Sequence, residues 1–482
     1  DSYIFSMVTI GDTINEHTDF TDQFFSSFVP EEKKLGKNIF INNLDSFFAD
    51  LFSKDTTVHT RAQQIISNIY YGEKGARKLV TAINALKTDK DYVDSKTKLI
   101  AELGYIKDST KKIVVGMLKK IYEQTSDTSI FQNEVLKALA RHKSSEAIQL
   151  FKELVLQDPP VFENNYDYIG MFNNLGDSIE LAATLYPQLL QLASVDDYKK
   201  PVLSLLKTLV DSGYIRDNQF EEYFNKIYFD AKIELKKQQG KDEKRIVEEM
   251  NNDNEEEAGR NYNNSDENKN ELIDYAALLI PFYDRNSNVP KFFDKLLRTK
   301  DEEVRLNASL ILLRNEKPVA DSVFNGLAEK DRWRGKLYRR LEQIKKLNKF
   351  PARYKTQIYM ARSYLVAEKN YNSVDSIVFV DKQRMVFQGK KGFVYFFKYR
   401  IKKDGDWKMG ISGLQPENIL EASSDNSLAA MTDKKIRPEL SVNDQYQEQL
   451  KRLLFTFHKS AHSFFDGNGN YHFSKSGENE ER

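Results

Sequence analysis

The sequence predicts a mainly α-helical protein, an α-solenoid of stacked helix hairpins with a small antiparallel β meander near its C-terminus. Three observations support this fold class. Apolar residues recur with the helical period over most of the chain. One pattern of helix start occurs twice, at residues 54–66 and 300–312. The apolar period changes to two within residues 373–420, which is typical of strands.

Composition limits the chemistry of the chain. The 482 residues include 72 Lys plus Arg and 72 Asp plus Glu, so the formal net charge of +0 gives no global argument for binding nucleic acid. The absence of cysteine excludes disulfides and metal sites built on thiolates. No run of about 18 apolar residues occurs, so the sequence predicts no membrane span.

The first 30 residues predict a strand and a short helix. Residues 3–10 are rich in aromatic and β-branched side chains, and Phe20, Phe24, Phe25 and Phe28 follow at helical spacing. Because one strand cannot form a sheet alone, we interpret residues 1–30 as the remnant of an upstream α+β domain. The alternative is a strand that pairs elsewhere in the chain.

Residues 31–236 predict a body of HEAT-like helical repeats. Short polar breaks separate the helices, as expected for antiparallel hairpins. Asp55, Ser109, Asp127 and Ser144 stand at helix starts, where their oxygens can accept the unpaired N–H groups of the first turn. The predicted helices are 42–52, 56–71, 74–87, 93–104, 109–125, 129–142, 144–156, 165–174, 179–193, 196–212 and 217–236.

A weak internal repeat supports stacking of these hairpins. The pattern Lys-Asp-x-x-Val-x-x-x-Ala-x-x-x-[Ile/Leu] begins at Lys54 and again at Lys300, and a partial copy begins at Asp127. Asp caps the helix, Val starts the buried stripe, and the small Ala permits close approach of the next helix. The pattern resembles HEAT and armadillo repeats, which stack into a solenoid. An irregular all-α domain is the alternative.

Residues 237–270 predict an acidic, Asn-rich linker. Eight acidic residues and one basic residue lie between Glu248 and Glu267, and apolar residues nearly vanish. Such a segment buries too little apolar surface to offset its chain entropy. A cation-binding or partner-docking arm is the minority alternative, since the acidic residues lack the spacing of a calcium loop.

Residues 271–372 predict a second stretch of helical repeats with an uneven charge. Twelve basic residues and two acidic ones lie within residues 330–362, with aromatic side chains between them. Basic helices with aromatic residues can bind phosphates or anionic surfaces. The alternative is a solvated face that pairs with acidic neighbours. The candidate partner- or anion-binding residues here are Arg332, Trp333, Arg334, Arg339 and Arg340.

Residues 373–420 predict a small antiparallel β module. Its four predicted strands are residues 376–380, 384–388, 392–402 and 407–412, separated by turn residues such as Asp404-Gly405. Lys398 and Arg400 form a basic face opposite an aromatic one and complete the candidate binding residues. Because so small a sheet needs a helix to pack on, we expect that role for residues 443–464. Residues 421–482 therefore predict a loop, this packing helix and a disordered tail.

Catalytic motifs are absent from the sequence. No P-loop, G-x-G-x-x-G, G-x-S-x-G or H-E-x-x-H string occurs. His458 and His462 share a helix face, but no third ligand accompanies them. The sequence therefore predicts no catalytic residue, no cofactor site and no metal site.

Several strings resemble the C-terminal region of large uncharacterised TraB/GumN-type bacterial envelope proteins. They are residues 40–55 (FINNLDSFFADLFSKD), 156–164 (LQDPPVFEN), 227–233 (IYFDAKI), 289–297 (VPKFFDKLL) and 389–399 (GKKGFVYFFKY). The resemblance implies an envelope location, either periplasmic or associated with the outer membrane. It also implies a catalytic domain upstream of this chain, and it brings no catalytic residue with it.

A second pointer to the envelope is a recurring Asp-[Ser/Thr] dipeptide followed by an aliphatic residue, Met or Thr. It is similar to the O-glycosylation acceptor pattern of some Gram-negative envelope proteins. The same dipeptides are also common at helix starts, which is the simpler interpretation. The possible acceptors are Thr13, Thr56, Ser109, Ser178, Ser322 and Ser376.

The sequence favours a non-enzymatic scaffold that binds a protein partner in the bacterial envelope, because solenoids present extended binding surfaces. Two alternatives remain. The chain could be the accessory region of a TraB/GumN-type hydrolase-like protein, or a polyanion binder that acts through residues 330–362.

Overall fold

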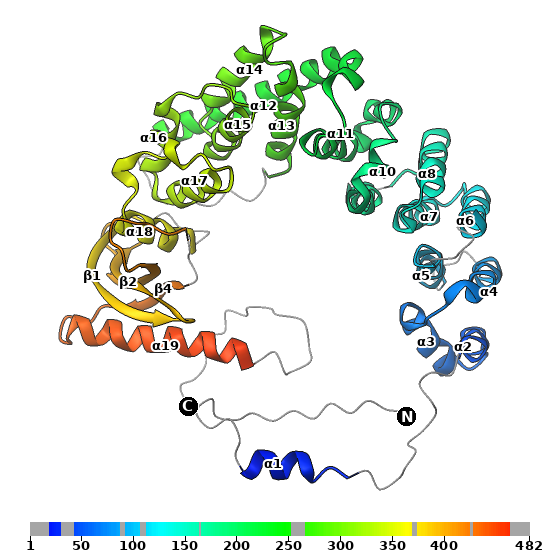
Figure 1. The fold of residues 1–482 in the computed structure, drawn as a ribbon, viewed down its shortest axis with the longest axis horizontal. Helices are drawn as coiled ribbons and strands as arrows, with labels where there is room; N and C mark the ends of the chain where they lie inside the picture. The colour runs from blue at the N-terminus through cyan, green and yellow to red at the C-terminus, as the bar shows by residue number, and fades with distance from the viewer. Residues whose placement is uncertain are drawn as a thin grey trace. The chain divides into compact units, whose positions relative to one another are not determined.

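A computed structural model describes residues 19–29, 43–86, 92–106, 112–162, 165–251, 266–368, 374–424 and 428–462. The chain is mainly helical with a small antiparallel sheet near its C-terminal end, as predicted (Figure 1). It divides into two compact units. We call Asn42–Ala352 the helical unit, and Asp1–Ile41 with Arg353–Arg482 the sheet unit.

The helical unit consists of α-helices joined by short loops and single turns of 3-10 helix. Its α-helices are α2 (Leu44–Leu51), α3 (Thr56–Gln64), α4 (Gly72–Ala85), α5 (Val93–Leu103), α6 (Lys112–Gln124), α7 (Ser129–His142), α8 (Ser145–Gln157), α9 (Asn165–Asn173), α10 (Ile179–Ala183), α11 (Asp196–Asp211), α12 (Phe224–Asn251), α13 (Asp266–Leu279), α14 (Asn288–Leu297), α15 (Glu302–Arg314), α16 (Asp321–Glu329) and α17 (Asp331–Gln343). The 3-10 helices are η1 (Ile66–Asn68), η2 (Asn174–Ser178), η3 (Gln188–Ser194), η4 (Asp217–Gln219), η5 (Glu221–Tyr223), η6 (Ile280–Phe282) and η7 (Leu347–Lys349).

Helices of this unit pack on the next helix and on the next but one. Contacts of the second kind join α5, α7, α9, α11, α13, α15 and α17 into one row, and they also join α6, α8 and α10. Figure 1 shows these helices following one another in chain order. One hydrophobic core accompanies them, from Leu44 in α2 to Leu312 in α15.

The two copies of the repeated pattern adopt the same local structure. Asp55 Oδ1 accepts the N–H groups of Thr57 and Val58 at 2.8 and 3.2 Å. Asp301 Oδ1 accepts the N–H groups of the corresponding residues of α15 at 2.9 and 3.2 Å. Ala62 and Ala308 are both buried. The predicted caps and close-packing alanines are therefore confirmed at both places.

The other predicted helix starts differ from one another. Ser144 Oγ accepts the N–H of Ala147 at 3.2 Å and caps α8 as expected. Asp127 does not cap α7, because that helix begins two residues later; Thr128 Oγ1 instead donates to Asp127 Oδ1 at 3.1 Å. Ser109 lies outside the described residues.

The structure differs from the predicted linker 237–270 at both of its ends. Helix α12 continues to Asn251 and helix α13 begins at Asp266, so residues 237–251 and 266–270 are helical where a linker was expected. Polar contacts hold this stretch: Gln238 Nε2 donates to Asp242 Oδ1 at 2.9 Å, and Asp242 Oδ2 accepts the Lys300 N–H at 2.9 Å. Apolar periodicity cannot reveal a helix held by polar contacts. Residues 252–265 lie outside the described residues.

The sheet unit holds four strands in the order β1-β2-β3-β4, all antiparallel, as predicted for a meander. Of the predicted N-terminal elements, residues 3–10 lie outside the described residues, and the predicted helix is α1. The elements are α1 (Asp19–Ser26), η8 (Ala352–Tyr354), α18 (Gln357–Glu368), β1 (Ser376–Phe387), β2 (Lys390–Arg400), β3 (Lys408–Pro416), β4 (Leu428–Lys435) and α19 (Val442–His462).

Two strand predictions were wrong in detail. Residues 376–380 and 384–388 belong to one strand, β1, and the expected turn at Asp381-Lys382 is a bulge where the pairing with β2 shifts between Phe379 and Asp381. Asp381 Oδ1 accepts the Lys382 N–H at 2.8 Å, so the local polar contact typical of a turn also suits a bulge. The fourth strand is β4, within residues expected to form a loop.

A helix covers each face of the sheet, rather than one helix on one face (Figure 1). The predicted aromatic face, with Tyr395, Phe397 and Tyr399, packs on α18. The opposite face buries Val394 and Phe396 against α19, whose residues Tyr446 and Leu450 lie in the same cluster. The prediction that residues 443–464 pack on the sheet is confirmed. Helix α18 was expected to continue the helical repeats; it belongs instead to the sheet unit.

Candidate functional site

Helix α17 carries most of the candidate binding residues, and it buries one of them. The Arg334 side chain is only 2% exposed. Its Nε donates to the Ala328 carbonyl at 2.7 Å and its Nη2 to the Glu329 carbonyl at 2.9 Å, while Nη1 pairs with Asp331. Arg334 therefore closes the C-terminal end of α16. It is not placed to bind a partner, which corrects its predicted role.

The outward face of α17 is basic. Arg332, Lys336, Arg339 and Arg340 are all exposed and recur at helical spacing on one side of the helix. Lys336 Nζ lies 4.7 Å from the ring centroid of the half-buried Trp333. The structure thus brings four of the five candidates of this tract together and adds Lys336. Helical spacing from Arg332 would have found Lys336 in the sequence.

Lys398 and Arg400 form a separate, smaller cluster in the sheet unit. Lys398 Nζ and Arg400 Cζ lie 4.9 and 5.0 Å from the ring centroid of Trp407, which precedes β3. Arg400 Nε also donates to Asp375 Oδ2 at 2.7 Å. Asp375 neutralises one of the two cations, so this cluster is less basic than the sequence suggested. The sequence did not reveal Trp407, because the pairing register of β2 and β3 brings it near.

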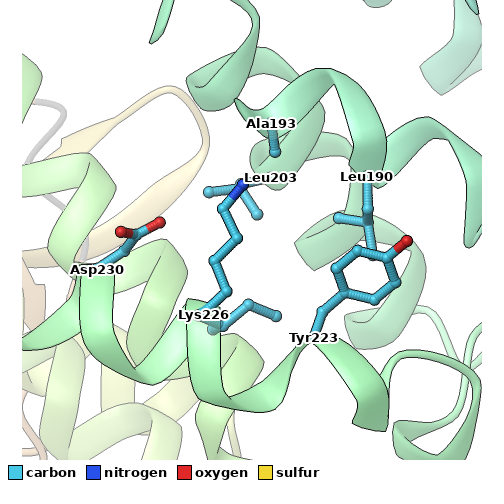
Figure 2. Close-up of a pocket in the computed structure, with 7 residues that line it drawn as sticks. Leu190, Ala193, Leu203, Tyr223, Lys226 and Asp230 are labelled. Carbon is cyan, nitrogen blue, oxygen red and sulfur yellow. The ribbon is translucent and has the colours of Figure 1, made fainter. Parts of the chain in front are cut away.

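A small hollow lies between η3, α11, η5 and α12 (Figure 2). In Figure 2 the Lys226 side chain extends between Asp230 and Tyr223 toward Leu203. The cavity measures about 10 Å³, which is close to the space that one water molecule needs. A substrate-sized molecule does not fit there. The lining residues are Leu190, Ala193, Leu203, Tyr223, Lys226, Ile227 and Asp230.

A half-buried ionic cluster adjoins this hollow through Asp230. Lys199 Nζ of α11 lies 3.4 Å from Asp230 Oδ2 of α12 and 3.9 Å from Glu271 Oε1 of α13. The Tyr275 hydroxyl donates to Glu271 at 3.5 Å. Burial, followed by the charge of Glu234, raises the pKa of Glu271. The cluster links α11, α12 and α13 through polar contacts between partly buried side chains.

Asp274 lies on α13 near this cluster and has a less favourable environment. Burial raises its pKa to about 6, and nearby Lys207 only partly opposes that effect. Perturbed carboxyl groups are frequent in active sites, but they also occur in structural networks. The charge of Asp274 interacts with those of Lys207, Asp211 and Glu271, so we interpret the group as part of a structural network.

A second hollow of about 150 Å³ lies near the start of the helical unit. His59 Nδ1 lies 2.6 Å from the Leu51 carbonyl oxygen, and its ring meets the Tyr92 ring edge-on at a centroid distance of 5.6 Å. These contacts fix the imidazole within the hydrophobic packing. Leu51, Phe52, Ser53, His59, Ala85, Leu86 and Tyr92 line this hollow.

Within the described ranges, no three His, Asp or Glu side chains gather closely enough to hold a metal ion. His458 and His462 lie in α19, but their side chains are not among those that the structure describes. In the part of the chain that the structure describes, none of the helices has both the length and the apolar character needed to cross a membrane.

Several possible glycosylation acceptors lie at structured positions. Thr56 is the first residue of α3, and Asp55 before it serves as the helix cap. Ser376 begins β1, and its hydroxyl donates to Asp375 at 2.9 Å. Thr13 and Ser109 lie outside the described residues. At residue 55 the Asp-Thr dipeptide therefore has a structural role of its own.

No protein-family model, no curated protein and no solved structure matches this chain.

Proposed function

We propose that the helical unit is an α-solenoid scaffold that binds a protein partner. The observation that carries the proposal is the row of alternate helices from α5 to α17, in which each helix packs on the next but one. Such stacking presents a long surface, and solenoid proteins use surfaces of this kind to bind partners.

The basic face of α17 is the part of this surface with the clearest chemical character. Its guanidinium groups can form bidentate hydrogen bonds with carboxylates. Trp333 offers an aromatic surface beneath Lys336. We therefore expect the partner to present an acidic segment that contacts Arg332, Arg339 and Arg340.

Affinity capture under native conditions tests this proposal. The full chain should retain a defined partner, and the triple reversal Arg332→Glu, Arg339→Glu, Arg340→Glu should lose it. The matched control is Lys120→Glu, Lys232→Glu, Lys236→Glu, which changes the charge equally at exposed positions elsewhere in the helical unit. Equal retention by both triple variants would remove α17 from the interface. A chain that retains nothing and turns over a substrate alone would overturn the scaffold function.

Polyanion binding is the second candidate function, and the same basic face of α17 favours it. If phosphate or sulfate groups are the ligand, affinity for a polyanion such as heparin should fall steeply as salt rises, because bound counterions are released. The triple reversal of α17 should abolish this binding. An affinity for heparin that does not change with salt would rule the candidate out.

The resemblance to TraB/GumN-type proteins supports a third proposal, an accessory region beside a catalytic domain in the bacterial envelope. The coding sequence upstream of Asp1 tests it: a signal peptide or a stop codon directly upstream would contradict it. Intact mass of protein purified from its native cells tests the proposed O-glycosylation. Unmodified mass would exclude glycosylation at Thr56, Ser178, Ser322 and Ser376.

A further inference from the structure

Three aliphatic side chains in β1 and in the loop after β3 are unusually exposed. Ile419 is 62% exposed and Leu420 is 85% exposed, and both lie in the loop that follows β3. Val386, near the end of β1, is 60% exposed. Single exposed aliphatic residues are ordinary on protein surfaces, but a cluster at one place marks an interaction site.

The strand pairing places the three residues at one end of the sheet. Gly392 pairs with Pro416, so the β1–β2 hairpin and the loop after β3 leave the sheet at the same end. Val386 pairs with Lys391, so their side chains share one face of the sheet. An ion pair between Arg384 and Glu417 joins that face to the loop.

Two buried glutamines fix the loop. Gln357 of α18 is 3% exposed, and its Nε2 donates to the carbonyls of Pro416, Asn418 and Glu421 at 2.8, 2.9 and 2.9 Å. Gln415 Oε1 accepts the Ser423 N–H at 2.9 Å. The loop is therefore held in one conformation that presents Ile419 and Leu420 outward.

The backbone at the tip is hydrogen-bonded within the loop itself. Asn418 Oδ1 accepts the Leu420 N–H at 3.1 Å, and the Asn418 carbonyl accepts the Glu421 N–H at 3.0 Å. Removing backbone groups from water is costly unless they already have partners. The Leu420 and Glu421 N–H groups keep these partners when water is excluded, which lowers the cost of placing them in an apolar environment.

Basic residues border the tip. Arg384, Lys390 and Lys391 are exposed at the same end of the sheet, against the two carboxylates of Glu417 and Glu421. Glu417 is ion-paired with Arg384, and Glu421 accepts a hydrogen bond from Asn418 Nδ2 at 2.9 Å. Three cations against two carboxylates leave a net charge of +1 at this end of the sheet, which favours an anionic surface over a basic one.

We propose that this end of the sheet unit docks on an anionic lipid surface, with Ile419, Leu420 and Val386 inserted among the acyl chains and Lys390 and Lys391 at the headgroups. Exposed aliphatic side chains beside lysines suit a lipid surface, because insertion among acyl chains needs no complementary pocket. Rigid presentation by Gln357 means that little ordering entropy is lost on docking. The inference rests only on residues of the sheet unit and is independent of the proposed scaffold function.

Vesicle binding by the full chain tests the proposal. The wild-type chain should co-sediment with vesicles of phosphatidylcholine mixed with phosphatidylglycerol and bind pure phosphatidylcholine more weakly. The double variant Ile419→Ser, Leu420→Ser should bind about a hundredfold more weakly, since each inserted aliphatic residue contributes about a factor of ten. The matched control is Leu440→Ser, because Leu440 is 42% exposed and lies toward the opposite end of the sheet. Both replaced positions are exposed, so thermal unfolding should not change.

A fluorescent label distinguishes insertion from mere attraction of charges. The chain has no cysteine, so Leu420→Cys carries a single environment-sensitive dye. Its emission should shift to the blue on mixed vesicles, and dye at Leu440→Cys should not respond. Absence of vesicle binding, equal binding by the double variant, or no shift at residue 420 would each overturn the proposal. Binding of a purified protein through Ile419 and Leu420, without any binding to vesicles, would also overturn the proposal.

Discussion

Arg334 in the helical unit and Gln357 in the sheet unit are buried polar side chains that both hold backbone carbonyls in place, but they do so over different sequence distances. Arg334 in the helical unit contacts the carbonyls of Ala328 and Glu329, five or six residues earlier in the chain. Gln357 in the sheet unit contacts the carbonyls of Pro416 and Glu421, 59 and 64 residues later.

The two residues also differ in charge. Arg334 is a buried cation beside Asp331, whereas Gln357 is a neutral amide that also accepts the Tyr395 hydroxyl at 2.7 Å. A buried ion that loses its partner costs more than an unpaired amide. The comparison shows that Arg334 joins two neighbouring helices through local contacts, while Gln357 joins parts of the sheet unit that are distant in sequence.

Replacing Arg334 should have the largest effect on stability. Arg334→Leu leaves the end of α16 without its donors and Asp331 without its cation, so we expect a loss of about 3 kcal/mol. Chemical denaturation of the full chain measures this, with circular dichroism reporting the helices. Arg332→Leu is the matched control on the exposed side of the same helix and should change stability by less than about 0.5 kcal/mol. Equal effects of the two substitutions would contradict the structural role of Arg334.

Replacing Gln357 should break the distant contact. Gln357→Leu strands three loop carbonyls and the Tyr395 hydroxyl, and we expect the sheet unit to lose about 2 kcal/mol. Gln357→Glu sharpens the test: the ionised carboxylate cannot donate, but the protonated form can. Burial favours the neutral form of a carboxyl group, so the stability of this variant should recover as the pH is lowered. Recovery of stability at high pH instead would show that hydrogen bonds donated by the Gln357 amide do not stabilise the sheet unit.

The sequence predicted features that depend on neighbouring residues and missed those that depend on distant ones. The helical period, the caps at Asp55 and Asp301, and the aromatic face of β2 are local patterns, and all are present. The extension of α12 was missed because Asp242 is held by Lys300, far along the chain. The strand β4 was missed because Leu428–Lys435 has little apolar alternation of its own and gains its order from pairing with β3.

The candidate site shows the same limit. The basic composition of residues 330–362 was evident in the sequence, but composition does not say which side of α17 each residue occupies. Helical spacing would have separated Arg334 from Arg332 and would have added Lys336. By contrast, the tip at Ile419 and Leu420 depends on Gln357, which no local pattern connects to it.

Asp274 differs from Arg334 and Gln357, because burial disfavours the charged form of its carboxyl group. Burial raises its pKa to about 6, so the folded state favours the protonated form and loses stability as pH rises through that value. Asp274→Asn should therefore stabilise the helical unit at pH 7, by about 1 to 2 kcal/mol after allowing for partial exposure. The gain should vanish near pH 4, where the carboxyl is protonated. Asp294→Asn, at an exposed position of α14, is the control and should show no such gain.

The smallest expected effect separates two helix caps that look alike. Asp55→Ala and Asp301→Ala each remove an oxygen that accepts two N–H groups, worth about 1 kcal/mol. The cap of α15 should matter more, because Val304 is fully buried whereas Val58 of α3 is only half-buried. Unfolding of the two variants measures the difference, and Asp301→Asn should restore most of the loss because Asn also caps. If Asp55→Ala lowers the stability more than Asp301→Ala does, burial of the first helical turn does not decide how much a cap contributes. Our explanation for the larger effect at α15 would then be wrong.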